Sequence, residues 1–176
     1  YIYRFTPGPN TFTLVFNFAL NYPKGDPPAG SCTGKGWFAW RDTFPAACGN
    51  VSGFAGVVYP QPILSDIEFD VDGSMILGFM DRLGHQHDPF NYGPTGTTIY
   101  YLNIGGDILR AYNNNGSYVL ENNGKAGSIT TAGAGNNQGP GGGESYYGDR
   151  WSLEGQDFHQ ETSNGGLALK PGSGEV

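Results

Sequence analysis

Charged residues are scarce in this chain. Only 14% of its 176 residues are Asp, Glu, Lys or Arg, the formal net charge is −7 and the pI is near 4.7. So low a charged fraction is more typical of secreted than of cytosolic domains. An acidic surface repels phosphate groups, which argues against a nucleic-acid partner and against docking on anionic lipid. The same charge permits a bound cation, and Ca²⁺ is the cofactor that we expect if one is present.

Long apolar runs and recognisable catalytic motifs are also missing. No apolar run approaches the ~18 residues of a membrane-spanning helix, so we expect no membrane insertion. No segment of ten or more residues keeps a helical apolar pattern free of Gly and Pro. There is no C-x-x-C or G-x-S-x-G motif, and the Gly-rich run 139–143 lacks the Lys-Ser/Thr of a phosphate loop. These absences exclude several metal, redox, hydrolase and nucleotide classes.

What the chain has is glycine, proline and aromatic residues. Its 30 Gly and 12 Pro make about a quarter of the sequence, which alone is typical of disordered segments. An aromatic content of 14% spread along the chain argues for an ordered core instead. This composition predicts an all-β fold with long Gly- and Pro-rich loops. Residues 1–176 are expected to form a single domain and to be a fragment of a larger protein, because both ends read as interrupted strands.

The clearest structural signal is residues 64–82. Ile67, Phe69 and Val71 alternate with acidic residues, Asp72-Gly73 is a hairpin-turn signal, and a nearly continuous apolar run follows from Met75. Further hairpins are predicted over 1–19, 106–121 and 165–176. Repeated hairpins, with Asp66 and Asp107 41 positions apart, favour part of a β-propeller. A β-sandwich is the alternative.

Residues 20–60 look like a loop insert that is closed by its own disulfide. Cys32 and Cys48 flank part of it, 16 positions apart, and predict a disulfide that closes the loop. In chain-entropy models such a bridge contributes about 3 kcal/mol, and it would place the protein outside the cytoplasm. Two free buried thiols are the alternative.

Two sets of polar residues are candidate metal ligands. Asp66, Asp70 and Asp72 lie at alternate positions of an expected strand and would project to one face. Their like charges are costly there unless they are solvated or are neutralised by an Arg or by a cation such as Ca²⁺. An EF-hand is excluded, because the acidic ligand expected at the end of such a loop is not in place. The second set consists of histidines, His85 and His87 in one loop and His159 in another. Structural roles in strand edges and loops are the alternative for both sets.

Aromatic residues in or beside loops are the remaining functional signal. Flat aromatic rings stack on sugars and anchor protein interfaces, or form the small cores of long loops. The candidate binding residues are Trp37, Trp40, Tyr92, Tyr146, Tyr147 and Trp151.

The segment 60–86 resembles part of large bacterial secreted or cell-surface proteins, in which a propeller-like N-terminal region precedes SdrD/Cna-B-type repeats. Segments 105–110, 120–124, 139–144 and 165–169 are similar too. The resemblance implies a bacterial extracellular or cell-surface location and a modular architecture, in a family with no established enzymatic activity. The leading hypothesis is therefore a structural and interaction module that contacts other surface proteins or a glycan. The alternatives are a metal- or carboxylate-dependent glycan hydrolase and a subunit of an extracellular filament or sheath.

Overall fold

The computed structural model describes residues 1–25, 36–87, 90–153, 156–160 and 163–176, without the side chains of 150–160. Across these ranges the chain is nearly all β, which confirms the predicted fold class. Two four-stranded sheets and three two-stranded sheets are present there, and none closes into a barrel. Helical structure in the same ranges is confined to α1 (Arg82–His87) and the 3-10 turn η1 (Pro140–Gly142).

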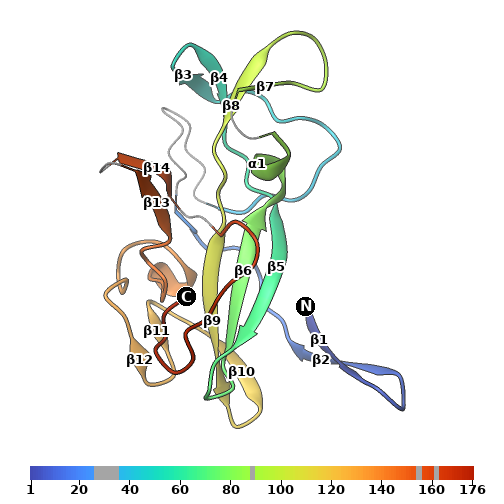
Figure 1. The fold of residues 1–176 in the computed structure, drawn as a ribbon, viewed down its shortest axis with the longest axis vertical. Coiled ribbons are helices and arrows are strands. Elements are labelled where there is room, and N and C mark those ends of the chain that lie inside the picture. The colour runs from blue at the N-terminus through green and yellow to red at the C-terminus, as the bar shows by residue number, and fades with distance from the viewer. Residues whose placement is uncertain (26–35, 88–89, 154–155, 161–162) are drawn as a thin grey trace.

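A four-stranded antiparallel sheet forms the centre of the molecule (Figure 1). In spatial order its strands are β10 (Ser117–Leu120), β9 (Asp107–Asn114), β6 (Met75–Asp81) and β5 (Pro62–Phe69). The predicted hairpins over 64–82 and 106–121 are the two halves of this sheet. Strand β6 lies between β5 and β9, which explains its continuous apolar sequence.

The turn between β5 and β6 forms where Asp72-Gly73 predicted it. Gly73 has a φ of 77°, a value that residues with a side chain rarely adopt. Asp70 N donates to Ser74 O at 2.9 Å, and Asp72 Oδ1 accepts a hydrogen bond from Ser74 N at 2.8 Å. Val71 lies in this turn and is exposed, so the strand pattern ends at Phe69.

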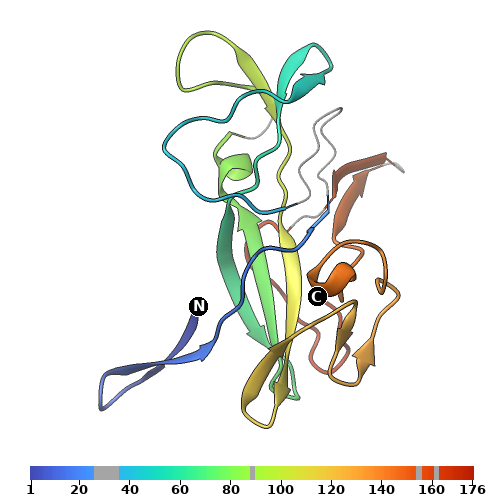
Figure 2. The ribbon, with the colours of Figure 1, turned by 180° about the vertical axis from the view of Figure 1, so that it is seen from behind.

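The N-terminal segment covers one face of the central sheet. It begins with the hairpin of β1 (Ile2–Thr6) and β2 (Thr11–Phe16) and then crosses the sheet (Figure 2). The main hydrophobic core lies under this segment and consists of Ile2, Phe16, Tyr22, Met75, Leu77, Phe79, Leu109 and Ala111. Burying these apolar side chains stabilises the packing of the N-terminal segment on the sheet.

The C-terminal segment covers the opposite face. Residues 163–176, which we call the C-terminal strap, run over β6 and β9 (Figure 1). A Cβ atom added to Gly78 would lie 3.1 Å from Leu167 Cγ, so Gly78 makes room for that side chain. The strap contains one isolated bridge, Lys170 to Glu175, instead of the predicted hairpin of two strands.

A second four-stranded sheet lies beyond α1. It combines β3 (Gly49–Val51), β4 (Phe54–Val57), β8 (Ile99–Leu102) and β7 (Asn91–Tyr92), and its β4–β8 pair is parallel. Val57, Leu83 and Leu102 form a small core between this sheet and α1. Two further hairpins are β11 (Lys125–Ala126) with β12 (Ile129–Thr130), and β13 (Arg150–Leu153) with β14 (Gln156–Gln160).

The finer propeller interpretation has no support in these sheets. Propeller blades repeat one antiparallel strand order, whereas the two four-stranded sheets differ in strand order and one contains a parallel pair. The β-sandwich alternative remains compatible with the strands. The predicted disulfide involves Cys32, which lies outside the described residues, so the Cys32–Cys48 pairing stays a prediction.

Candidate functional site

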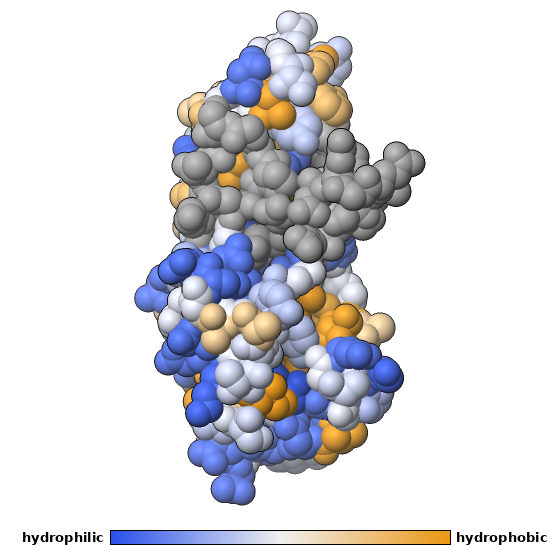
Figure 3. Space-filling model, turned by 90° about the vertical axis from the view of Figure 1, so that its left-hand side faces the viewer, coloured by the Kyte–Doolittle hydropathy of each residue, from blue (hydrophilic) through white to orange (hydrophobic). Residues whose placement is uncertain are grey.

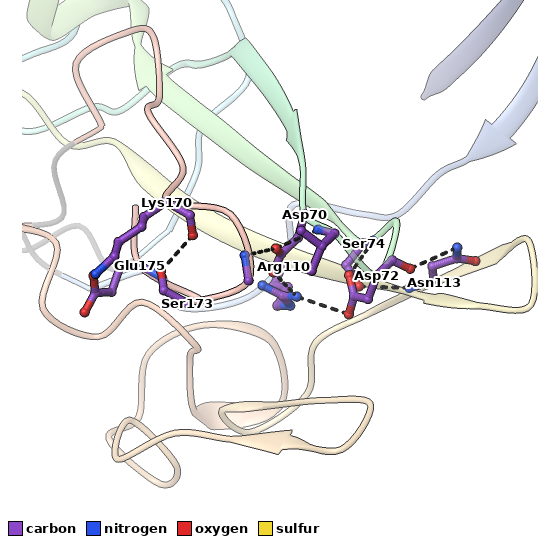
Figure 4. A network of polar contacts seen from close by, with 10 residues as sticks. Asp70, Asp72, Ser74, Arg110, Asn113, Lys170, Ser173 and Glu175 are labelled. Atoms are coloured by element: carbon purple, nitrogen blue, oxygen red, sulfur yellow. Dashed lines mark hydrogen bonds and ion pairs between the residues drawn. The ribbon is translucent and has the colours of Figure 1, made fainter.

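Arg110 on β9 is the centre of a buried ion-pair network (Figure 4). Its Nη2 atom donates to Asp70 Oδ2 at 2.8 Å and lies 3.3 Å from Asp72 Oδ2. The other oxygen of Asp70 accepts hydrogen bonds from Gly172 N at 2.8 Å and Val71 N at 2.7 Å. The ion pair with Arg110, followed by the hydrogen bond from Gly172, lowers the pKa of Asp70. This network joins the β5–β6 turn, strand β9 and the C-terminal strap.

Further contacts fix the strap along the sheet. Leu167 N donates to Asp66 Oδ2 at 2.7 Å, and Ser65 Oγ lies 2.9 Å from Gly165 O. At the start of the strap, the backbone of Ser163 lies directly on Gly106. The strap is therefore held at its beginning, its middle and its end.

A cavity of about 500 Å³ opens between the strap and the segment 145–149. We call it the Tyr147 cavity, and it is lined by Ile108, Ser145, Tyr146, Tyr147, Gly148, Asp149, Glu175 and Val176. Tyr147 is 54% exposed, so its ring can meet a ligand from solvent. The side of the molecule that carries β11 and β12 is mostly hydrophilic, with small separate apolar patches (Figure 3).

Three carboxyl groups are buried next to residues of the cavity wall. They belong to Asp107, Glu121 and Glu144, and we call them the carboxyl trio. Burial raises the pKa of Asp107 to about 6 and that of Glu121 to about 7. Burial, reinforced by the charge of Asp107, raises the pKa of Glu144 to about 7. Their partners are internal: Glu121 accepts hydrogen bonds from the backbone N–H groups of Arg110 and Ser145, and Glu144 accepts one from Asn136 Nδ2.

Asp107 also belongs to a polar group on the core side of the sheet. Tyr22 Oη donates to Asp107 Oδ2 at 2.6 Å, and Trp37 Nε1 donates to Tyr22 Oη at 3.2 Å. Burial, then the nearby Asp107 charge, raises the pKa of Tyr22 well above its ordinary value. Lys24 is fully buried beside this group, with Nζ 3.4 Å from Gly106 O and 5.2 Å from the centre of the Trp37 ring. The sequence alone does not reveal this lysine or the trio, because no local pattern marks a residue that is buried by distant segments.

The predicted acidic metal ligands do not converge on one point. Asp66 binds the strap, whereas Asp70 and Asp72 face Arg110. Within the described ranges no group of three His, Cys, Asp or Glu side chains is arranged to hold a metal ion. Calcium binding by these residues stays a prediction.

The histidines lie in a different setting from the extended loop that the sequence suggested. His85 and His87 are on α1, where residues two apart point in different directions. His87 packs against Phe44 at a ring distance of 4.8 Å and against Tyr100. His85 Nε2 and His87 Nδ1 are buried without a hydrogen-bond partner among the described residues. The side chain of His159, in β14, is not described.

The predicted aromatic residues divide between structural and exposed positions. Trp37 packs against the main core, while Trp40 donates to Pro62 O at 2.9 Å and lies under the Arg82 guanidinium. Tyr92 is exposed on β7 of the second four-stranded sheet. Tyr146 and Tyr147 are the two that the structure brings to one cavity. The side chain of Trp151 is not described.

Comparison with known proteins places the chain among eukaryotic relatives. It is 31% identical over 184 aligned residues to Colossin-A of Dictyostelium discoideum, and the match covers 99% of this chain. The chain is similar to the colossins. A second match, to Colossin-C of the same organism, is 27% identical and covers 76% of the chain. The matches span only 1% and 11% of these two relatives, so the chain corresponds to a small part of each.

These matches correct the resemblance drawn from the sequence. The relatives are eukaryotic colossins and not bacterial proteins with SdrD/Cna-B-type repeats. No family model matches the chain, and no solved structure matches it. Short Gly-, Asn- and Asp-rich turn segments occur in unrelated β proteins, which is why those fragments misled. No helix in the described part of the chain is long and apolar enough to cross a membrane.

Proposed function

We propose that the chain is a non-enzymatic structural and interaction module, outside the cell or at its surface, that contacts a neutral glycan through the Tyr147 cavity. One observation carries the glycan contact: a half-exposed tyrosine stands at a cavity of about 500 Å³ that also has two carboxylate residues, Asp149 and Glu175, in its wall. The similarity to the colossins supports a structural, surface-type role over an enzymatic one.

The chemistry of the cavity suits a sugar. An aromatic ring can stack on the apolar face of a pyranose, and carboxylate oxygens accept hydrogen bonds from sugar hydroxyl groups. The volume is within the range of small-molecule sites, about 300–1,000 Å³. The acidic surface of the chain favours a neutral glycan over a sulfated or phosphorylated one.

The buried carboxyl groups support binding without hydrolysis. A glycosidase needs two carboxyl groups that reach the scissile bond from opposite sides. Asp107, Glu121 and Glu144 have the raised pKa values that such chemistry uses, but each is almost completely buried and bonded to internal donors. Their contacts join the core, β9 and the segment 136–145, which is a structural role.

The test combines binding with product analysis. The chain is mixed with cellulose and with chitin as probes, and the bound fraction and the released reducing ends are both measured. We expect saturable retention on one polymer without reducing-end release. Tyr147→Ala should weaken binding about tenfold, because loss of an aromatic stack costs about 1–1.5 kcal/mol.

Tyr92→Ala is the matched control, since Tyr92 is 59% exposed and lies on the other four-stranded sheet. It should leave retention unchanged. Equal weakening by both variants, or no binding to either polymer, would contradict the glycan contact. Release of reducing ends that Asp149→Asn or Glu175→Gln abolishes would favour a hydrolase instead, because these are the two carboxylate residues in the cavity wall.

A further inference from the structure

The N-terminal arm, strands β1 and β2, carries an apolar face that nothing in the described part of the chain covers. Tyr3 pairs with Leu14 and Phe5 pairs with Phe12 across the two strands, so these four side chains share one face. They are 43–71% exposed, and the Phe5 and Phe12 rings lie 5.0 Å apart. Figures 1 and 2 both show the arm extending away from the body.

The opposite face of the arm is polar. It carries Arg4 paired with Thr13 and Thr6 paired with Thr11. Arg4 is the only charged side chain in residues 1–23, whereas the whole chain has a net charge of −7. The arm is thus a ribbon with one apolar face, one polar face and a positive charge, attached to an acidic body.

Strand β5 offers an edge that matches this ribbon. It is the last strand of the central sheet, with β6 on one side and no strand on the other among the described residues. Leu64, Ile67 and Phe69 are paired with the core residues Phe79, Leu77 and Met75, so they lie along the core face of this edge. Leu64 and Phe69 are exposed there.

The other face of the β5 edge is acidic. Asp66 is opposite Gly78 and Glu68 is opposite Ile76, which places both carboxylates on the face away from the core. Glu68 has no ion pair with any described residue, whereas Asp66 accepts a hydrogen bond from the strap. An added strand would meet apolar side chains on one face and negative charge on the other.

We propose that the arm of one copy pairs with the β5 edge of a second copy, with β1 extending the central sheet. In this arrangement the apolar face of the arm continues the core face of the sheet. Arg4 then lies on the same face as Glu68 and Asp66. The apolar faces and the polar faces of the two elements therefore match in the same arrangement. The positive charge of Arg4 meets the negative charges of Glu68 and Asp66, and this complementarity selects a second copy of this chain as the occupant.

The pairing would stabilise the two-stranded arm and cover the unpaired edge of β5 in one contact. An isolated two-stranded hairpin is marginal in water, and a long unpaired edge strand invites association. The contact joins two different surfaces, so repeated use builds an open chain of molecules, while reciprocal exchange of arms closes a dimer. This inference does not depend on glycan contact at the Tyr147 cavity.

The first experiment measures the mass of the 176-residue chain against concentration by sedimentation velocity, from about 1 μM to 1 mM, the range of weak, small interfaces. We expect a reversible rise above 18.8 kDa. Amide hydrogen exchange in residues 63–69 should slow as the assembly forms. A chain that stays monomeric throughout overturns the proposal and assigns the arm to a different partner.

Exchanging the charges of Arg4 and Glu68 tests whether these two residues face each other in the assembly. Arg4→Glu and Glu68→Arg should each raise the dissociation constant about tenfold, and the double variant should recover most of the loss. Lys125→Glu, an equal charge change at an exposed residue of β11, should have no effect. Phe12→Ala should weaken association about tenfold without changing the melting temperature of the monomer, because Phe12 is 71% exposed.

Two results would exclude this contact even if the chain associates. One is association that Arg4→Glu and Phe12→Ala leave unchanged. The other is a double variant no tighter than the single variants, since a direct pairing of the two faces requires recovery.

Discussion

Asp70 and Gly172 are 102 positions apart in the sequence and are joined by a 2.8 Å hydrogen bond from the Gly172 N–H group to the Asp70 carboxylate. The other oxygen of the same carboxylate binds Arg110. One side chain thereby links the β5–β6 turn, strand β9 and the C-terminal strap. The strap in turn forms part of the wall of the Tyr147 cavity through Glu175 and Val176.

Removing the charge of Asp70 should loosen this link. Among the described residues, Asp70→Asn leaves the buried Arg110 guanidinium with the more exposed Asp72 as its one acidic partner. We expect a loss of about 3 kcal/mol in the free energy of unfolding, measured by urea denaturation. Asp42→Asn is the control, because Asp42 is exposed and should change stability by less than about 0.5 kcal/mol. Equal effects of the two variants would show that the network contributes little.

Stability should fall as the pH rises from about 4.5 to about 7. The folded state raises the pKa of Glu121 and Glu144 from 4.5 to about 7, and that of Asp107 from 3.8 to about 6. In this window the folded chain binds more protons than the unfolded chain, so the free energy of unfolding decreases with pH. Asp70 has a lowered pKa, and its contribution is lost at still lower pH. Melting temperatures across pH 3–8 should therefore be highest near or just below about pH 4.5 and fall toward pH 7.

Glu144→Gln isolates one member of the carboxyl trio. Glutamine keeps an oxygen that can accept the hydrogen bond from Asn136 Nδ2 but never ionises. The variant should melt at a higher temperature than the parent chain at pH 7.5 and at a similar temperature at pH 5. A pH dependence of melting that is the same in both proteins would contradict the assignment of this carboxyl group.

Gly106 should be intolerant of any side chain. A Cβ atom there would lie 2.2 Å from Ser163 N and 2.7 Å from Phe79 O, and neither backbone atom can rotate away. We expect Gly106→Ala to cost about 3 kcal/mol and to release the strap. Gly148→Ala is the matched control, because no atom lies within 4 Å of its added Cβ. Limited proteolysis within 163–176 provides a second readout of strap release.

The predicted disulfide can be tested by thiol counting. Unfolded, non-reduced chain should show no reactive thiol, and Cys48→Ser should lower the free energy of unfolding by about 3 kcal/mol. Two reactive thiols in unreduced, freshly purified protein would mean that Cys32 and Cys48 are not paired.

Local pattern was enough for the hairpins of the central sheet and of the N-terminal arm. The alternation around Ile67, the turn at Asp72-Gly73 and the apolar run from Met75 predicted the central hairpin, because pairing of neighbouring strands is specified by residues close in sequence. Strands β1 and β2 were predicted in the same way, although the exposure of the Phe5 and Phe12 face was not.

The candidate site depended on contacts between distant segments. The histidine pair at 85 and 87 read as an extended loop, and only the packing of the second sheet against Leu83 reveals a helix there. The C-terminal residues read as a hairpin, yet Asp66 and Asp70 hold them as a strap. Asp66 binds the strap, whereas Asp70 binds both the strap and Arg110, and their spacing in the sequence did not distinguish these roles.

The sequence by itself determined the all-β class, the principal hairpins and the acidic surface, since each follows from composition or from residues within one turn and its flanking strands. Only the tertiary structure decided that Lys24 is buried, that the carboxyl trio is held close to protonation, and that Tyr147 stands at a cavity. The physical reason is the same for all three. Burial, pKa and access to solvent depend on which distant segments cover a side chain, and neighbouring residues do not encode that covering.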